Sequence, residues 1–167
     1  MSTKKDKFSS KDKKFMRLAL NLARARKGLT GDNPSVGCVI VKNDNLLSVG
    51  QTGLYGRPHA EINAINNSFE DLSGSKMYVT LEPCNHYGKT PPCTKSIIKA
   101  GISNVFYSIN DIDKRVKGKS FKILTKKKIK VRRGLLKKEI RNFYDSYFFH
   151  RKNKLPFVTA KIAVSRN

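Results

Sequence analysis

Three residues that can bind zinc, spread over 35 consecutive positions, constrain the fold of this chain more than any other feature. His59, Cys84 and Cys93 stand in three different segments, with an apolar run and a loop rich in proline between them. A catalytic zinc ion needs three protein ligands and one open position for water, and one His with two Cys is a competent set. We therefore expect a fold that brings the ends of three separate segments to one point.

Glu61 adds chemistry to this set, because it follows His59 by two residues. A carboxylate beside such a centre can act as a general acid and base, taking a proton from water and delivering protons to a leaving group. Two other interpretations are open. A structural zinc site usually takes four protein ligands, for which His86 is the other nearby candidate, and the two cysteines could instead be buried thiols. The joint pattern favours a catalytic zinc site.

Hydrophobic periodicity predicts strands that alternate with helices. Helical spacing of apolar residues predicts helices over residues 9–28, 59–67, 94–100, 116–124 and 136–147. Apolar and β-branched runs predict strands over residues 36–41, 46–49, 76–81, 105–109 and 129–131. Because the run 36–41 is almost continuously apolar, we expect that strand to be buried on both faces. This order predicts an α/β protein whose sheet is covered by helices on both faces.

The net charge of +23 suggests a nucleic-acid partner, but the distribution of charge argues against one. Residues 1–28 carry 10 basic and 2 acidic groups, and residues 114–167 carry 19 basic and 2 acidic groups. Residues 29–113, which contain the His and Cys pattern, carry 6 basic and 8 acidic groups. The excess charge therefore lies outside the motif region, and nucleic acid is disfavoured as the ligand of the site.

The cysteines and the termini indicate a reducing compartment. No segment approaches the roughly 18 consecutive apolar residues that cross a bilayer, and no apolar signal segment follows the Lys-rich N-terminus. Three cysteines, an odd number, argue against a disulfide framework, and Cys38 in an apolar strand run is expected to be a buried thiol. We therefore expect a cytoplasmic protein without membrane contact, of the size of one ordinary domain.

Three longer segments carry a family resemblance. They read NPSVGCVIV at 33–41, PHAE at 58–61 and TLEPCNHYGKTPPC at 80–93. Together they resemble the deaminase domain of the riboflavin-biosynthesis deaminase/reductase family, over most of residues 14–165. Eight residues separate the two cysteines here, whereas most nucleic-acid and cytidine deaminases have two. The GKTPPC insert is specific to the riboflavin family.

The resemblance implies a cytidine-deaminase-like fold, a three-layer αβα sandwich with a central mixed sheet. The implied reaction is zinc-dependent hydrolytic deamination of 2,5-diamino-6-(5-phosphoribosylamino)pyrimidin-4(3H)-one to 5-amino-6-(5-phosphoribosylamino)uracil and ammonia, in riboflavin biosynthesis. One zinc ion per chain would be held by His59, Cys84 and Cys93, and Glu61 would be the catalytic proton shuttle. The implied substrate contacts are Asn33, His86, Lys89, Asp111 and Asp113.

Some of these contacts have simpler alternatives, and some depart from the family pattern. Lys89 could be a solvated loop cation, although a phosphorylated substrate would give its charge a partner, and His86 could hydrogen-bond locally. Thr52 replaces a His that the family usually has before PHAE, so one polar contact is changed. The segment 111–114 lacks the family's prolines and has Asp113 where Asn is usual, which weakens the expected contacts to the ribose.

The C-terminal segment raises the question of a second activity. Residues 155–165 resemble the opening strand of the family's NADPH-dependent reductase domain, and the sequence ends at Asn167. We expect a basic N-terminal tail over residues 1–13, a zinc-dependent deaminase domain over 14–150, and a remnant of the linker and first reductase strand over 151–167. No NADPH site is expected in this chain, and reduction is expected from a separate reductase or a missing portion.

Two other functions remain as alternatives. The chain could deaminate bases in tRNA or another nucleic acid, or it could be a non-catalytic module whose zinc only stabilises the fold. The near-neutral motif region disfavours the first, and Glu61, which a structural site does not need, disfavours the second. We expect a small phosphoribosylated pyrimidine as the substrate, and the sequence leaves open whether the chain forms a homo-oligomer.

Overall fold

The computed structural model describes residues 8–88 and 90–165 of the chain. Within them, five strands form one sheet in the order β2-β1-β3-β4-β5. β1 is antiparallel to β2 and β3, whereas β3, β4 and β5 run parallel, so the sheet is mixed. All five predicted strands are present: β1 Gly37–Lys42, β2 Asn45–Gln51, β3 Lys76–Leu81, β4 Asn104–Ile109 and β5 Lys130–Arg133.

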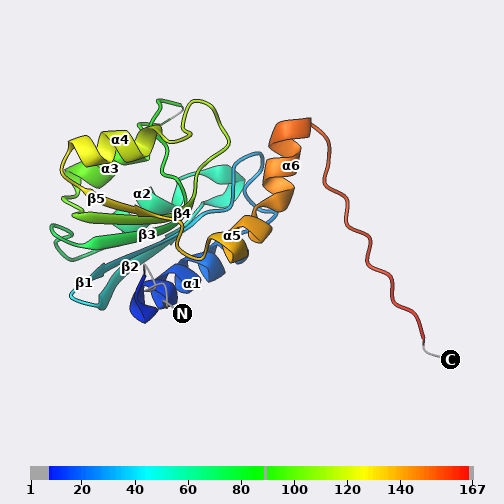
Figure 1. Ribbon diagram of the computed structural model, residues 1–167, viewed down its shortest axis with the longest axis horizontal. Helices are drawn as coiled ribbons and strands as arrows, with labels where there is room; N and C mark the ends of the chain where they lie inside the picture. Colours follow the sequence, from blue (N-terminus) through cyan, green and yellow to red (C-terminus); the bar gives the residue numbers. More distant parts are fainter. Residues whose placement is uncertain (1–7, 89, 166–167) are drawn as a thin grey trace, which may run out of the picture.

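Helices cover both faces of this sheet (Figure 1). One face carries α2 Ala60–Asn66, α3 Cys93–Lys99 and α4 Lys119–Lys126, and the other carries α1 Ser10–Arg24 and α5 Lys137–Phe143. α6 Asp145–Asn153 follows α5, and a short 3-10 helix, η1 Leu54–Gly56, precedes α2. The predicted three-layer αβα sandwich with a mixed sheet is confirmed.

Local sequence explains the first helix and the central strand. Ser9 caps α1 in a capping box: its hydroxyl accepts from the N–H of Asp12, and the Asp12 carboxylate accepts from the N–H of Ser9. Residues 37–41 of β1 are all buried, as their apolar run predicts. Cys38 is one of them, so the expected buried thiol is confirmed.

Two glycines let helices approach the sheet closely. A Cβ atom on Gly37 would lie 1.8 Å from the carbonyl oxygen of Ala19 in α1. A Cβ atom on Gly50 would lie 2.2 Å from the carbonyl oxygen of Ala60, the first residue of α2. Any larger residue at position 50 would therefore displace the end of α2 at which His59 lies.

The fourth helix begins later than the predicted range 116–124. Gly118 adopts a left-handed conformation, with φ of 74°, directly before the first residue of α4. The buried Glu82 carboxylate accepts hydrogen bonds from the N–H of Gly118 at 2.9 Å and of Ser120 at 3.2 Å. This contact from the end of β3 satisfies N–H groups at the start of the helix, so a residue distant in sequence fixes where it begins.

The single helix predicted over residues 136–147 is wrong, because two helices meet at Tyr144. This residue ends α5 and precedes α6, with φ of −91° and ψ of 4°. Its ring is 2% exposed, and its hydroxyl donates to the carbonyl oxygen of Ser35 at 2.8 Å and bonds to the Thr80 hydroxyl at 2.7 Å. The break in the helix accompanies this buried attachment to the sheet.

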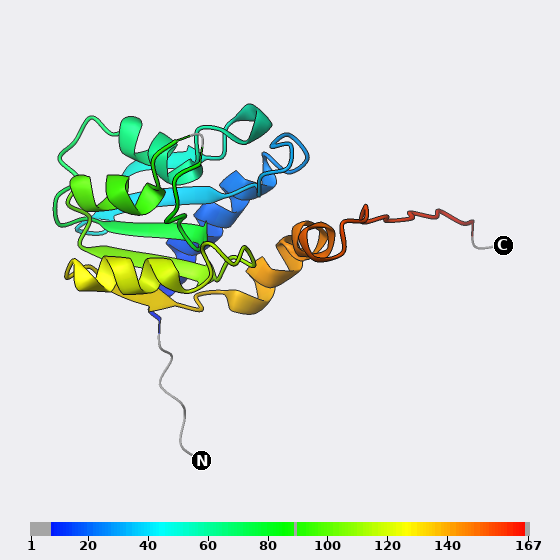
Figure 2. The same ribbon diagram turned by 90° about the horizontal axis from the view of Figure 1, so that it is seen from above.

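The C-terminal segment leaves the body of the fold (Figure 2). Residues 155–165 form no helix or strand, and all of them are exposed. Phe157 contacts the ring of Phe149 in α6, with 5.6 Å between the ring centroids. Across residues 8–88 and 90–165, no helix has the length and apolar character that a membrane crossing requires.

Candidate active site

His59, Cys84 and Cys93 come together at one end of the sheet. His59 is the residue before α2, Cys93 is the first residue of α3, and Cys84 lies in the loop that leaves β3. The Nδ1 atom of His59 is 3.3 Å from the sulfur of Cys93 and 3.6 Å from the sulfur of Cys84. All three ligand atoms lie within 4.8 Å of one another. The sequence prediction that these residues converge is confirmed.

The spacing of these atoms fits a zinc ion. Zinc bonds of about 2.3 Å to sulfur and about 2.05 Å to nitrogen, at the tetrahedral angle, place sulfur and nitrogen about 3.6 Å apart. The two observed separations, 3.3 Å and 3.6 Å, agree with that value. Because the set has three members, it leaves the fourth position of the tetrahedron for water or substrate.

The protonation of the two thiols also suits a cation. The sulfur of Cys84 accepts hydrogen bonds from the Cys93 thiol, from His59 and from the Cys93 N–H at 3.2 Å, which lowers the pKa of Cys84 far below its usual value. The same hydrogen bond to Cys84, together with burial, raises the pKa of Cys93. The Cys84 thiol therefore loses its proton more readily than the Cys93 thiol, and a bound metal ion would favour the thiolate form of both.

Glu61 lies in the first turn of α2 with 4% of its surface exposed. Burial raises the pKa of this carboxyl group, against the opposing effect of His59. The carboxyl group lines the same cavity as His59 and Cys84. A buried carboxyl group beside the ligand set is suitably placed to exchange protons with a bound substrate.

A cavity of about 310 Å³ opens beside these residues. Seven of the nine predicted site residues line it: Asn33, His59, Glu61, Cys84, His86, Asp111 and Asp113. Cys93 is fully buried behind the wall, where its sulfur still reaches the ligand set. Lys89 lies outside the described residues. The structure therefore brings together the residues that the resemblance implied, while the role of each one stays a prediction.

Two residues of the cavity wall, His86 and Thr52, differ in whether their polar atoms have hydrogen-bond partners in the described part of the chain. The Nδ1 atom of His86 is buried and has no hydrogen-bond partner within the part of the chain that the structure describes. A buried polar atom without a partner indicates a site where a ligand or water binds. Thr52, in contrast, is engaged: its hydroxyl accepts from the N–H of Val36 at 2.9 Å and donates to the carbonyl oxygen of Pro34 at 3.2 Å.

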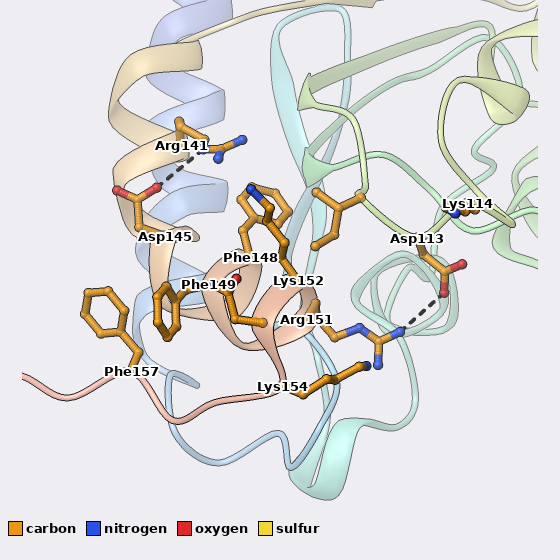
Figure 3. A pocket seen from close by; sticks show the side chains of 12 residues that line it. Asp113, Lys114, Arg141, Asp145, Phe148, Phe149, Arg151, Lys152, Lys154 and Phe157 are labelled. Atoms are coloured by element: carbon orange, nitrogen blue, oxygen red, sulfur yellow. Dashed lines mark hydrogen bonds and ion pairs between the residues drawn. The ribbon is translucent and has the colours of Figure 1, made fainter.

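Asp111 and Asp113 differ in their partners. Burial raises the pKa of Asp111, whose Oδ1 atom accepts from the N–H of Asp113 at 3.0 Å. Asp113 accepts from Nε and Nη2 of Arg115 at 3.0 Å and 2.6 Å, and this pair holds the pKa of Asp113 well below its usual value. Arg151 also reaches Asp113, at 3.5 Å (Figure 3). Asp113 thus acts first as an anchor for two arginines.

Among the lining residues that the sequence analysis did not select are Arg57, Arg115, Tyr147 and Arg151. Arg57 stands two residues before His59, so its proximity to the motif was a usable signal. Tyr147 and Arg151 come from α6 and reach the cavity only through the fold. Asp113 and Arg151 also line a second, larger cavity of about 890 Å³ between α6 and the C-terminal segment, shown in Figure 3.

Comparison with known proteins identifies the family. Residues 9–109 match the family described as "Cytidine and deoxycytidylate deaminase zinc-binding region". The chain belongs to this family. The enzyme is therefore a zinc-binding pyrimidine deaminase, as the sequence predicted.

The relatives of this deaminase fall into two lengths. It is 44% identical over 146 residues to the "Diaminohydroxyphosphoribosylamino-pyrimidine deaminase" of Buchnera aphidicola subsp. Schizaphis graminum, covering 87% of this chain and 99% of the relative. It is 40% identical over 152 residues to the "Riboflavin biosynthesis protein RibD" of Aquifex aeolicus, covering 91% of this chain but 43% of the relative. The chain thus spans nearly all of one relative and less than half of the other.

Solved structures agree with both fold and family. The RibD structure from Acinetobacter baumannii superposes with a TM-score of 0.82 at 36% identity, over 88% of this chain and 42% of that one. The deaminase/5-amino-6-(5-phosphoribosylamino)uracil reductase of Thermotoga maritima gives a TM-score of 0.80 at 37% identity, over 88% of this chain and 43% of that one. The predicted resemblance to the deaminase part of this bifunctional family is confirmed.

Proposed function

We propose that this deaminase hydrolyses 2,5-diamino-6-(5-phosphoribosylamino)pyrimidin-4(3H)-one to 5-amino-6-(5-phosphoribosylamino)uracil and ammonia, a step of riboflavin biosynthesis. One observation carries the proposal: His59, Cys84 and Cys93 converge beside the buried Glu61 at the wall of a cavity. The name of the Buchnera relative, which this chain covers almost completely, supports the choice of substrate.

In this reaction a water oxygen adds to C2 of the pyrimidine ring, which carries one of the two amino groups. The bond from C2 to that amino nitrogen breaks, and the 5-amino group is kept. His59, Cys84 and Cys93 would hold zinc, which lowers the pKa of water and so supplies a nucleophile at neutral pH. Glu61 accepts the proton that water loses and delivers protons to the ring nitrogen and to the departing amino group. Water and substrate thus yield the uracil product and ammonia, with atoms and charge balanced.

The remaining cavity residues orient the substrate. Asn33 presents its amide beside Gly56, where a Cβ atom would lie 2.1 Å from the amide nitrogen, so this side chain is held in a tight place. His86 offers its unpartnered Nδ1 atom to a polar group of the ring. Asp111 and Asp113 lie on the wall where the resemblance implied contacts to the ribose. We assign these four residues to substrate binding.

Ammonia release tests the proposal. The purified protein, with and without a chelator, should release ammonia from the phosphoribosylated diaminopyrimidine and much more slowly, or not at all, from cytidine and tRNA. Glu61→Gln should lower kcat by about 10²- to 10⁴-fold while zinc content and Tm stay close to those of the wild type. Deamination of tRNA in preference to the pyrimidine, or full activity of the Glu61→Gln variant, would contradict the proposal.

We also infer that the residues of this chain carry out the deamination alone, and that reduction of the product depends on a separate reductase or on a portion outside this sequence. The Buchnera relative is named as a deaminase alone, whereas the Thermotoga maritima protein, of which this chain covers 43%, is named as deaminase and reductase. We assign the deaminase activity to residues 14–150. We also propose that the enzyme is cytoplasmic. Oxidation of NADPH by the purified chain, with the deaminated product as substrate, would refute the inference that it carries out the deamination alone.

A further inference from the structure

The proposed substrate carries a phosphate group, and three arginines line the cavity that would receive it. These are Arg57, Arg115 and Arg151. A guanidinium group binds phosphate through paired, charge-assisted hydrogen bonds, so these arginines are candidate partners of the phosphate, as is Lys89, which lies outside the described residues. Their other contacts decide which of them is available.

Arg115 and Arg151 already share a carboxylate. Arg115 is bound to both oxygens of Asp113, by Nε at 3.0 Å and 3.1 Å and by Nη2 at 2.6 Å. Arg151 reaches the same carboxylate at 3.5 Å, as the dashed line in Figure 3 shows. Asp113 therefore neutralises one of the two positive charges at this end of the cavity and occupies N–H donors of both arginines, and its own charge would repel a phosphate placed beside it.

Arg57 has no carboxylate partner within residues 8–88 and 90–165. Its Nη1 atom donates to the hydroxyl of Thr90, a neutral group, at 2.6 Å. Because a guanidinium group has five N–H donors, this single hydrogen bond leaves donors for a ligand. The residue is half-buried, so a bound phosphate group would supply the counterion that the described residues do not.

The backbone holds Arg57 in place. The N–H of Gly53 donates to the carbonyl oxygen of Pro58 at 2.9 Å, closing the turn that contains Arg57. Across the cavity mouth, a Cβ atom on Gly88 would lie 3.5 Å from Nη2 of Arg57. The guanidinium group thus lies between the turn that precedes His59 and the residues Gly88 and Thr90, with Nη2 beside the backbone of Gly88.

We propose that Arg57 is a substrate-binding residue that holds the phosphate group of the substrate. The proposal rests on the proposed function, which supplies the phosphate. It orients the substrate with the pyrimidine ring at His59, Cys84 and Glu61 and with the phosphate beside Arg57, near Gly88 and Thr90. Arg57 then gives preference for the phosphorylated substrate over its dephosphorylated riboside.

Kinetics with two substrates test this assignment. kcat/KM is measured for the wild type, Arg57→Ala and Arg57→Lys with the phosphorylated diaminopyrimidine and with its riboside. A hydrogen-bonded charge contact of this kind corresponds to about a 10- to 100-fold change. We expect that loss for Arg57→Ala with the phosphorylated substrate, a smaller loss for Arg57→Lys, and less than about a twofold change with the riboside. Binding of ribose 5-phosphate, measured by calorimetry, should weaken in parallel.

Three further variants separate a phosphate contact from other effects. Thr90→Val removes the hydrogen bond between Thr90 and Arg57 but keeps the positive charge of Arg57. A loss of kcat/KM equal to that of Arg57→Ala would mean that Arg57 acts only by holding Thr90 in place. Arg17→Ala removes one exposed positive charge from α1 and should leave both substrates unaffected. A phosphate-selective loss in Arg115→Ala but not in Arg57→Ala would overturn the assignment. If the wild type deaminates neither substrate, the proposed function fails, and calorimetry with ribose 5-phosphate still tests Arg57.

Discussion

Removal of one buried hydroxyl group should destabilise this deaminase measurably. Tyr144 lies at the junction of α5 and α6, and its hydroxyl donates to the carbonyl oxygen of Ser35. Since that proton is used, the Thr80 hydroxyl must donate to the tyrosine oxygen, while the Thr80 oxygen accepts from the N–H of Gly37 at 3.2 Å. Tyr144→Phe therefore breaks two linked, buried hydrogen bonds. The carbonyl oxygen of Ser35 and the hydroxyl of Thr80 are then left without this partner, at positions buried from water.

The expected cost follows from these two bonds. Each contributes about 1 kcal/mol net, and a buried group left without a partner adds to the loss, so the free energy of unfolding should fall by about 2–3 kcal/mol. For a chain of this size, that corresponds to a decrease in Tm of about 5–10 °C. Urea unfolding of the zinc-loaded protein should show a lower midpoint with an unchanged m value, because the surface exposed on unfolding is the same.

A matched tyrosine provides the control. Tyr55 is 88% exposed, and Tyr55→Phe should change the free energy of unfolding by less than about 0.5 kcal/mol. In a double-mutant cycle with Thr80→Val, the two changes should be non-additive by about 1 kcal/mol, because both remove the same hydrogen bond. If Tyr144→Phe changes the free energy of unfolding as little as Tyr55→Phe does, the hydrogen bonds of the Tyr144 hydroxyl do not stabilise the fold and the reasoning is wrong.

Three other changes give distinct outcomes. Gly50→Ala should cost about 1–3 kcal/mol and lower zinc content, since the new methyl group would meet the Ala60 carbonyl oxygen; metal analysis and thermal unfolding check this. Burial alone would raise the pKa of Asp12, but hydrogen bonds from Tyr78 and Ser9 lower it overall. The stabilisation from Asp12 is therefore complete above about pH 4 and is lost as pH falls through the lowered pKa, so Asp12→Asn should flatten the acid limb of a stability curve. Chelation should lower Tm, and added zinc should restore it.

Local sequence patterns were sufficient for most of the elements and for the three residues that converge as candidate metal ligands. The first helix and the buried strand β1 each depend on neighbouring residues only, through the capping box at Ser9 and the apolar run, and both elements were predicted. His59, Cys84 and Cys93 could be selected because zinc accepts few residue types and demands a fixed number of them. Spacing and residue type therefore carried this part of the prediction.

Contacts between distant segments account for what was missed. Glu82 fixes the start of α4 from 36 residues away, and no pattern within residues 116–124 reveals it. The attachment of Tyr144 to Ser35 spans 109 residues, while its flanking helices share one apolar face, so periodicity predicted an unbroken helix. Arg151 was missed because it lies in α6, far in sequence from the motif, and only the fold brings it to the cavity. Such residues are identifiable only once the fold has placed them.

The strand at one edge of the sheet has a consequence for self-association. Within residues 8–88 and 90–165, β5 pairs with β4 on one side only, and its residues Lys130, Arg132 and Arg133 are exposed. A free strand edge is a template for pairing with another chain, and a row of positive charges opposes this because two identical edges repel each other. Screening shortens that repulsion, so concentrated salt weakens it. The basic residues of β5 are therefore expected to oppose edge-to-edge aggregation of the sheet, an effect that concentrated salt should reduce.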